Sequence, residues 1–146
     1  MKIVRRVEIR AKPELIWDVI TDLRRAKEWA PGFEDYPYIS EEWPKQGSEA
    51  IWRYHAGLMS IDFKLKMKDS ERGKRLCITN SGAFGLGIED YRFQFANGLT
   101  IVGYETSSEP SLLGRIMMPL MRKKLLRQID TTIANLKVFC ERKENA

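Results

Sequence analysis

Most of the chain alternates apolar and polar residues with a period of two, the pattern of half-buried β-strands. The first such stretch covers residues 2–10, where Ile3, Val7 and Ile9 share one face and charged residues occupy the other. Arg5 interrupts the apolar face. We therefore expect a first strand that lies at a sheet edge or carries a polar group at a rim.

A helical repeat follows this strand. Pro13 suits the first turn of a helix, and apolar residues at steps of three and four carry that helix to about Leu23. A second short helix is expected over residues 24–29, and Pro31-Gly32 closes the segment.

The end of the chain, from Ser111 onward, is also helical in pattern. An apolar stripe recurs there at steps of three and four residues, which predicts a long amphipathic helix. Pro119 marks a kink, or separates a short first helix from the main one. The stripe consists of Leu125, Ile129, Ile133, Leu136 and Cys140.

Three hairpins between the helices can be registered from their turn residues: Gly57-Leu58, Arg72-Gly73 and Asn97-Gly98. Each predicted register gathers apolar residues on one face and charged residues on the other, and a slip of one residue would exchange the faces. The third turn pairs Phe93 with Val102, Tyr91 with Tyr104 and Glu89 with Thr106. The second pairs Met67 with Ile78 and Leu65 with Asn80, and the first pairs Tyr54 with Ile61 and Trp52 with Phe63. The first register also predicts two cross-strand charge pairs, Arg53 with Asp62 and Glu49 with Lys66.

Composition fits a single globular domain over residues 1–146, with 43% apolar and 31% charged residues. No apolar run approaches the roughly 20 residues that span a bilayer, and charges occupy the first residues where a signal peptide would be apolar. We therefore expect a cytoplasmic protein. Cys77 and Cys140 are expected to be buried thiols, and a single histidine, His55, offers little for a metal site. No metal and no cofactor are predicted.

The order of elements indicates an α+β fold, with a curved antiparallel sheet of about seven strands covered by the last helix. Two stretches resemble a known family. The first consists of residues 13–22 followed by Trp29-Ala30-Pro31-Gly32. The second begins at Leu113-Gly114-Arg115, continues through Pro119-Leu120 and ends with residues 132–137. They are similar to the START-like (SRPBCC) superfamily, nearest to its polyketide cyclase/dehydrase and lipid-transport branch. The resemblance implies a helix-grip fold, with two short helices after strand one and an apolar cavity between the sheet and the C-terminal helix.

The hairpin registers place a largely aromatic and apolar set of side chains on the inner face, which suits an adaptable ligand pocket or a filled core. The family resemblance favours the pocket. The predicted ligand-binding residues are Trp52, Tyr54, Phe63, Leu65, Met67, Ile78, Asn80, Glu89, Tyr91, Phe93, Val102, Tyr104, Met117 and Met121, with Leu120 and Leu125 also expected to face the sheet.

Glu89 is the candidate catalytic residue, because an inward carboxylate must find a partner or take up a proton. It would orient a ligand hydroxyl or act as a general base; alternatively, it reaches solvent or a loop amide near the strand end. Tyr91 and Tyr104 would donate hydrogen bonds to a carbonyl or simply pack across the strands. The register places His55 on the outer face, so we reject it as a base.

Residues 82–87, Gly-Ala-Phe-Gly-Leu-Gly, lack the order and the following helix of a phosphate-binding loop and are interpreted as a tight turn or bulge at a pocket rim. The net charge of +5 comes entirely from the last 36 residues, which hold 8 basic and 3 acidic side chains. Arg122, Lys123, Lys124 and Arg127 would contact an anionic membrane, touch RNA non-specifically, or form a solvated helix face. No signature of specific nucleic-acid binding accompanies them.

Three functions remain open at this point. The first is binding, with or without transport, of a lipid-like or polycyclic aromatic molecule. The second is a cofactor-independent cyclase or dehydratase that uses Glu89 and the tyrosines. The third is an interaction module that acts through the basic C-terminal helix.

Overall fold

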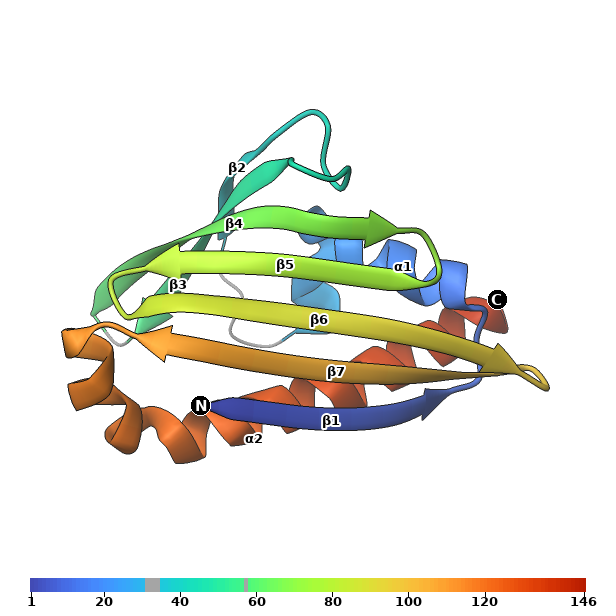
Figure 1. Ribbon diagram of the computed structural model, residues 1–146. Helices are drawn as coiled ribbons and strands as arrows, with labels where there is room; N and C mark the ends of the chain where they lie inside the picture. The colour runs from blue at the N-terminus through green and yellow to red at the C-terminus, as the bar shows by residue number, and fades with distance from the viewer. Residues whose placement is uncertain (31–34, 57) are drawn as a thin grey trace.

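A seven-stranded antiparallel sheet curves around a long C-terminal helix in the computed structural model, which describes residues 1–30, 35–56 and 58–146 (Figure 1). This is the expected α+β, helix-grip architecture. The sheet order is β1-β7-β6-β5-β4-β3-β2, so β1, the strand that carries Arg5, lies at an edge. The elements are β1 (Lys2–Ile9), α1 (Pro13–Thr21), the 3-10 helix η1 (Leu23–Glu28), β2 (Asp35–Ile39), β3 (Glu49–Ala56), β4 (Met59–Glu71), β5 (Arg75–Gly82), β6 (Gly85–Ala96), β7 (Leu99–Pro110) and α2 (Leu112–Glu144).

The predicted strand pairs are confirmed in all three hairpins, including Tyr91 opposite Tyr104 and Trp52 opposite Phe63. One turn is longer than predicted. Glu71 pairs with Arg75, so three residues form the β4–β5 turn, and Gly73 adopts a left-handed φ of 76° there. A register shift between Met67 and Asp69 absorbs the extra residue and restores the predicted pairing further along the strands.

The outer face of the β3–β4 hairpin carries the expected opposite charges. Arg53 and Asp62 form an ion pair, with Nε and Oδ1 2.9 Å apart. Glu49 lies opposite Lys66 as predicted, but its carboxylate pairs with Lys64 at 3.5 Å. Strand twist brings such diagonal neighbours within reach of long side chains.

The first helical segment divides as predicted into a helix and a shorter one. The helix α1 ends at Thr21, two residues earlier than expected, and the second helix is of the 3-10 type. Buried apolar residues of α1, among them Ile16 and Ile20, pack into the core, and Trp17 Nε1 donates to the Arg75 carbonyl at 3.3 Å. The predicted closing residues Pro31-Gly32 lie outside the described residues.

α2 is one helix of 33 residues that contains Pro119 and changes direction in its first third (Figure 1). Proline removes one backbone donor and crowds the preceding turn, which accounts for the expected kink without a break. Leu136 and Cys140 of the predicted stripe are buried, whereas Leu125, Ile129 and Ile133 are half-buried. No helix among the described residues is long and apolar enough to cross a membrane.

The C-terminal half of α2 is tied to β1 by polar contacts. Arg5 Nε donates to Asp130 Oδ1 at 2.6 Å, so the inward arginine serves as an anchor for the helix. Lys137 Nζ donates to the Glu8 carbonyl at 2.6 Å, and the Arg10 backbone N–H donates to Glu141. These contacts fix one end of the helix under the edge of the sheet.

Candidate functional site

Burial divides the concave face of the sheet into a fully buried half and a half-buried half, which we call the open half. Next to α1, inward side chains such as Met67, Leu76 and Val102 are at most 2% exposed. Toward the end where β3 meets β4 and β7 leads into α2, inward side chains remain half-buried (Figure 1). The half-buried inward residues there include Trp52, Tyr54, Phe63, Asn80, Glu89, Tyr91 and Thr106.

An aromatic wall forms one side of the open half. The Trp52 ring stacks on Phe63 with centroids 5.0 Å apart, and it lies 5.6 Å from the Tyr54 ring. Gly82 on β5 leaves room for this wall, because a Cβ there would come within 3.0 Å of the Phe63 ring. The wall offers apolar and π surface to whatever lies against it.

A carboxylate with a tyrosine partner lies further along the same face of the sheet, on β6 and β7. Tyr104 Oη donates to Glu89 Oε1 at 2.9 Å, and the Tyr104 ring lies 4.9 Å from that of Tyr91. Glu89 thus has a side-chain partner on the neighbouring strand β7.

Burial is the first cause of the shifted acidities in this cluster. It raises the pKa of Glu89 above its ordinary value, and the hydrogen bond from Tyr104 offsets only part of that rise. Burial, and next the nearby charge of Glu89, raise the pKa of Tyr91 and Tyr104 well above the usual value. The phenols therefore stay protonated and remain hydrogen-bond donors, while the carboxyl group holds its proton more tightly than an exposed one.

Two further polar side chains lie on the same inner face. Asn80 packs over Gly87, where a Cβ would come within 2.7 Å of the amide oxygen. Ser108, opposite Gly87, has a buried hydroxyl without a hydrogen-bond partner among the described residues. Together with Glu89 and Tyr104, these groups can hold the polar end of a mostly apolar molecule.

Tyr36 of β2 is a member of this cluster that sequence reasoning missed. Its side chain packs against the core, and its pKa is raised by burial and by the charge of Glu89, which places the phenol near that carboxylate. Pro37 is atypical of a strand interior, and no hairpin turn registers residues 35–39 against a neighbouring strand. Two tyrosines two residues apart, at 36 and 38, were the available signal.

The remaining predicted residues fall into three groups. Some lie in the packed core with 0–8% exposure, and their role as ligand contacts stays a prediction: Leu65, Met67, Ile78, Phe93 and Val102. Met117, Met121 and Leu125 on α2 are half-buried. The expectation that Leu120 faces the sheet is wrong, because it is 78% exposed and lies about 100° around the helix from Met121.

The glycine-rich segment forms the tight β5–β6 turn that was expected. Gly85 has a φ of 123° and lies against the backbone at the start of α2. The backbone of His55 pairs with Ser60 as predicted; its side chain and Gly57 lie outside the described part of the chain. Among the described residues, no three His, Cys, Asp or Glu side chains come together as metal ligands would.

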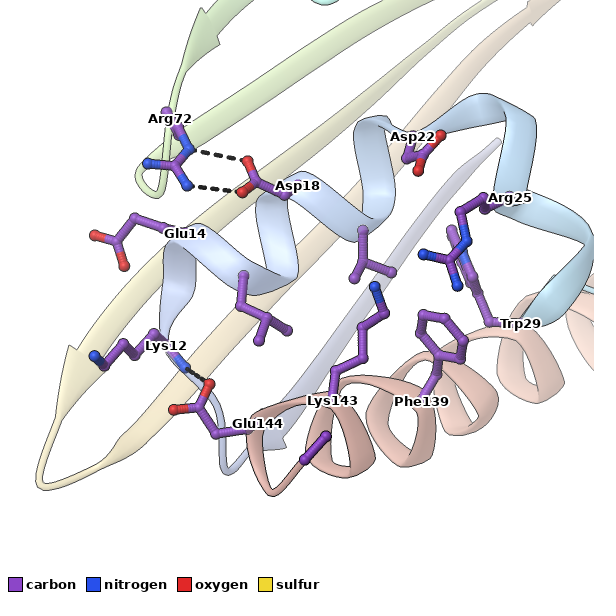
Figure 2. Close-up of a pocket in the computed structure, with 13 residues that line it drawn as sticks. Lys12, Glu14, Asp18, Asp22, Arg25, Trp29, Arg72, Phe139, Lys143 and Glu144 are labelled. Atoms are coloured by element: carbon purple, nitrogen blue, oxygen red, sulfur yellow. Dashed lines mark hydrogen bonds and ion pairs between the residues drawn. The ribbon is translucent and has the colours of Figure 1, made fainter.

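A groove of about 710 Å³ lies elsewhere, between α1 and the C-terminal end of α2 (Figure 2). Four basic and four acidic side chains line it. Arg72 and Asp18 form an ion pair at 2.7 Å, and Glu144 accepts a hydrogen bond from the Lys12 backbone N–H at 3.3 Å. None of the predicted site residues lines this groove. The balanced charge gives it no preference for an anion or a cation.

Comparison with solved structures supports the fold. Protein CV1439 from Chromobacterium violaceum superposes with a TM-score of 0.76 at 14% identity, covering 97% of this chain and 98% of that one. The protein TTHA0849 from Thermus thermophilus gives a TM-score of 0.72 at 16% identity, with 94% of each chain covered. A conserved protein from Geobacillus kaustophilus gives 0.70 at 14% identity, covering 97% and 96%.

The sequence itself carries a family assignment. No curated protein matches the chain in a sequence search. A family model described as polyketide cyclase / dehydrase and lipid transport matches residues 1–141, which is nearly the whole chain. The chain therefore belongs to the polyketide cyclase / dehydrase and lipid transport family.

Proposed function

We propose that the protein binds a hydrophobic small molecule, lipid-like or polycyclic aromatic, between the open half of the sheet and α2. The observation that carries this proposal is a half-buried inner face that combines an aromatic wall with the hydrogen-bonded pair Glu89 and Tyr104. Apolar walls with a few convergent polar groups are typical of small-molecule sites. Membership of the family is consistent with this proposal.

The first experiment is native mass spectrometry of the protein purified from its own host, followed by extraction of any bound small molecule. A stoichiometric apolar passenger is expected. The same protein is then titrated with fatty acids, sterols and polyaromatics against an apolar fluorescent probe. Failure to retain or take up any of them would remove the binding proposal.

A matched pair of variants locates the site. Phe63→Ala removes part of the aromatic wall and is expected to weaken binding about tenfold or more, as the loss of a buried aromatic contact predicts. Phe95→Ala is the control, because Phe95 is 51% exposed at the opposite end of the sheet. Equal weakening by both variants would place the ligand elsewhere.

An enzymatic role for the same site is supported by one observation, the raised pKa of Glu89 beside a tyrosine that stays protonated. The ionised carboxylate would accept a proton from an activated carbon, and Tyr104 would donate to the developing oxyanion. Glu89→Gln separates the two roles: a carrier with this substitution still binds its ligand, whereas an enzyme binds it and no longer transforms it.

The proposed setting is the cytoplasm. Cys77 and Cys140 are both free and buried, with 3% and 0% exposure, which suits a reducing compartment. Fractionation of host cells, with the protein followed by an antibody, tests this location.

A further inference from the structure

Exposed apolar side chains gather at the open end of the molecule. The β3–β4 turn presents Leu58, fully exposed, and Met59 at 66%, and the start of α2 presents Leu112 at 77% and Leu120 at 78%. Leu113 and Ile116 on the same turns of α2 are 47% and 61% exposed. Both segments lie at the end of the sheet where β7 leads into α2 (Figure 1). Clustered exposed apolar residues of this kind mark an interaction surface.

The outer face of α2 changes character along its length. At 100° per residue, Leu112, Ile116 and Leu120 lie on the side of the helix that points away from the sheet. Lys123 and Arg127 continue the same side over the next two turns and are also exposed. Leu112, Ile116 and Leu120 thus form an apolar tip, and Lys123 and Arg127 form a basic collar. At 1.5 Å per residue, the centre of the collar lies about 13 Å along the helix axis from the centre of the tip.

The charge of this region is uncompensated. Residues 110–129 contain five basic side chains and no acidic one: Arg115, Arg122, Lys123, Lys124 and Arg127. All five are exposed. Exposed positive charge of one sign favours an anionic surface as its complement.

The apolar tip is held in place by the rest of the fold. Ser111 caps α2 by accepting from the Gly114 N–H at 3.1 Å, and its hydroxyl donates to the Ala83 carbonyl at 2.8 Å. Gly114 lies directly against the Phe84 carbonyl, where no side chain would fit. The start of α2 is therefore fixed to the β5–β6 turn, beside the β3–β4 turn, and does not depend on a ligand for its position.

We propose that this end of the molecule docks on an anionic lipid bilayer, with Leu58, Met59 and the first turns of α2 inserted and the basic collar against the lipid phosphates. Apolar insertion combined with basic side chains is the physical signature of peripheral membrane binding. The surface is the outer side of the turns of α2 whose inner side is proposed to line the ligand site. Vesicle binding does not require the ligand and is tested without one.

The test is co-sedimentation with two kinds of vesicle, phosphatidylcholine alone and phosphatidylcholine with about 30% phosphatidylglycerol. Each basic residue near an anionic surface contributes about fivefold in affinity, so the protein should prefer the vesicles that contain phosphatidylglycerol. Lys123→Gln with Lys124→Gln is expected to weaken binding to anionic vesicles about 25-fold. Ile116→Gln with Leu120→Gln is expected to weaken it at least about tenfold, from lost apolar burial. The matched controls are Lys66→Gln with Lys68→Gln on the outer sheet face and Val138→Gln on the other end of α2, which leave binding unchanged.

Insertion has its own readout. Cys77 and Cys140 are buried, so Leu58→Cys provides a single accessible thiol for a polarity-sensitive fluorophore. Its emission is expected to shift to the blue on anionic vesicles, whereas a label at Val138→Cys does not shift. An unshifted label at position 58, or controls that weaken binding as much as the test variants, would overturn the proposal. So would a dimer abolished by Ile116→Gln with Leu120→Gln in the absence of vesicle binding, since that outcome assigns the surface to a second copy.

Discussion

At the scale of single residues, the inner face is organised around one acid. Glu89 accepts a hydrogen bond from Tyr104 at 2.9 Å, in surroundings that disfavour its charge. Because its pKa in the folded protein lies above the ordinary value of 4.5, the folded state binds this proton more tightly than the unfolded chain does. Protonated Glu89 therefore contributes fully to stability at pH values below its pKa in the unfolded chain. This contribution is lost as the pH rises through the pKa of Glu89 in the folded protein.

Glu89→Gln should therefore stabilise the protein at neutral and alkaline pH and leave it unchanged near pH 4, because glutamine keeps the shape and removes the buried charge. Each unit by which the pKa is raised corresponds to about 1.4 kcal/mol in the free energy of unfolding. Urea unfolding of both proteins across this pH range measures the difference. A constant difference at all pH values would show that Glu89 does not titrate in this way.

Tyr104→Phe should raise the pKa of Glu89 further. The hydroxyl donates to the carboxylate and favours its charged form, so its removal leaves burial unopposed. The chemical shift of the Glu89 carboxyl carbon, followed by NMR against pH, reports this change. Tyr54→Phe, on β3 three strands away from Glu89 in the same sheet, is the control. A titration unaltered by Tyr104→Phe would argue against the hydrogen bond.

At the scale of elements, α2 is held at both ends by different means. Its C-terminal half is tied to β1 through Asp130 and Lys137, and its first turn depends on the Ser111 cap. The stretch between them carries Pro119 and spans the open end of the sheet. Both ends of the helix are therefore fixed to the rest of the fold.

Ser111→Ala should lower the free energy of unfolding by about 1 kcal/mol, the usual loss for an N-cap serine. Both of its hydrogen bonds, from Gly114 and to the Ala83 carbonyl, disappear together. Denaturant midpoints of Ser111→Ala and of Ser111→Thr, which keeps the hydroxyl, provide the comparison. Equal losses in the two variants would indicate a steric effect in place of the cap.

The strand pairs of the hairpins could be predicted, because two independent signals specify the same register: the turn residues, and the alternation of apolar and polar residues along each strand. The bulge between Met67 and Asp69 could not, since Lys64, Lys66 and Lys68 continue the same outward alternation across it. In the candidate site, Glu89 and Tyr104 followed from the β6–β7 register. Tyr36 did not, because β2 joins the cluster through a long-range pairing that no local pattern specifies.

At the scale of the whole molecule, inner-face side chains are fully buried in one half of the sheet and half-buried in the other. Around α1, residues such as Ile9, Ile16 and Leu76 are completely buried, which is a core packed without a ligand. Toward the opposite end, half-buried aromatic and polar side chains face α2 while exposed apolar ones face outward. Stability and proposed function are thus located in different parts of one sheet.

This division predicts which segments of the chain a bound ligand protects from amide hydrogen exchange. Addition of N-phenyl-1-naphthylamine at about 100 times its dissociation constant should slow amide hydrogen exchange about 100-fold in segments whose opening releases the probe. We expect that protection in residues 50–54, 61–65 and 115–125, and little change in residues 76–78 and 100–102, which already lie in the packed half. At the same probe concentration, Phe63→Ala should reduce this slowing about tenfold or more, in line with its weaker binding. Protection confined to residues 12–18 and 139–146 would instead place the probe in the groove of Figure 2, where the apolar surface of Leu15, Val19 and Phe139 is the competing site.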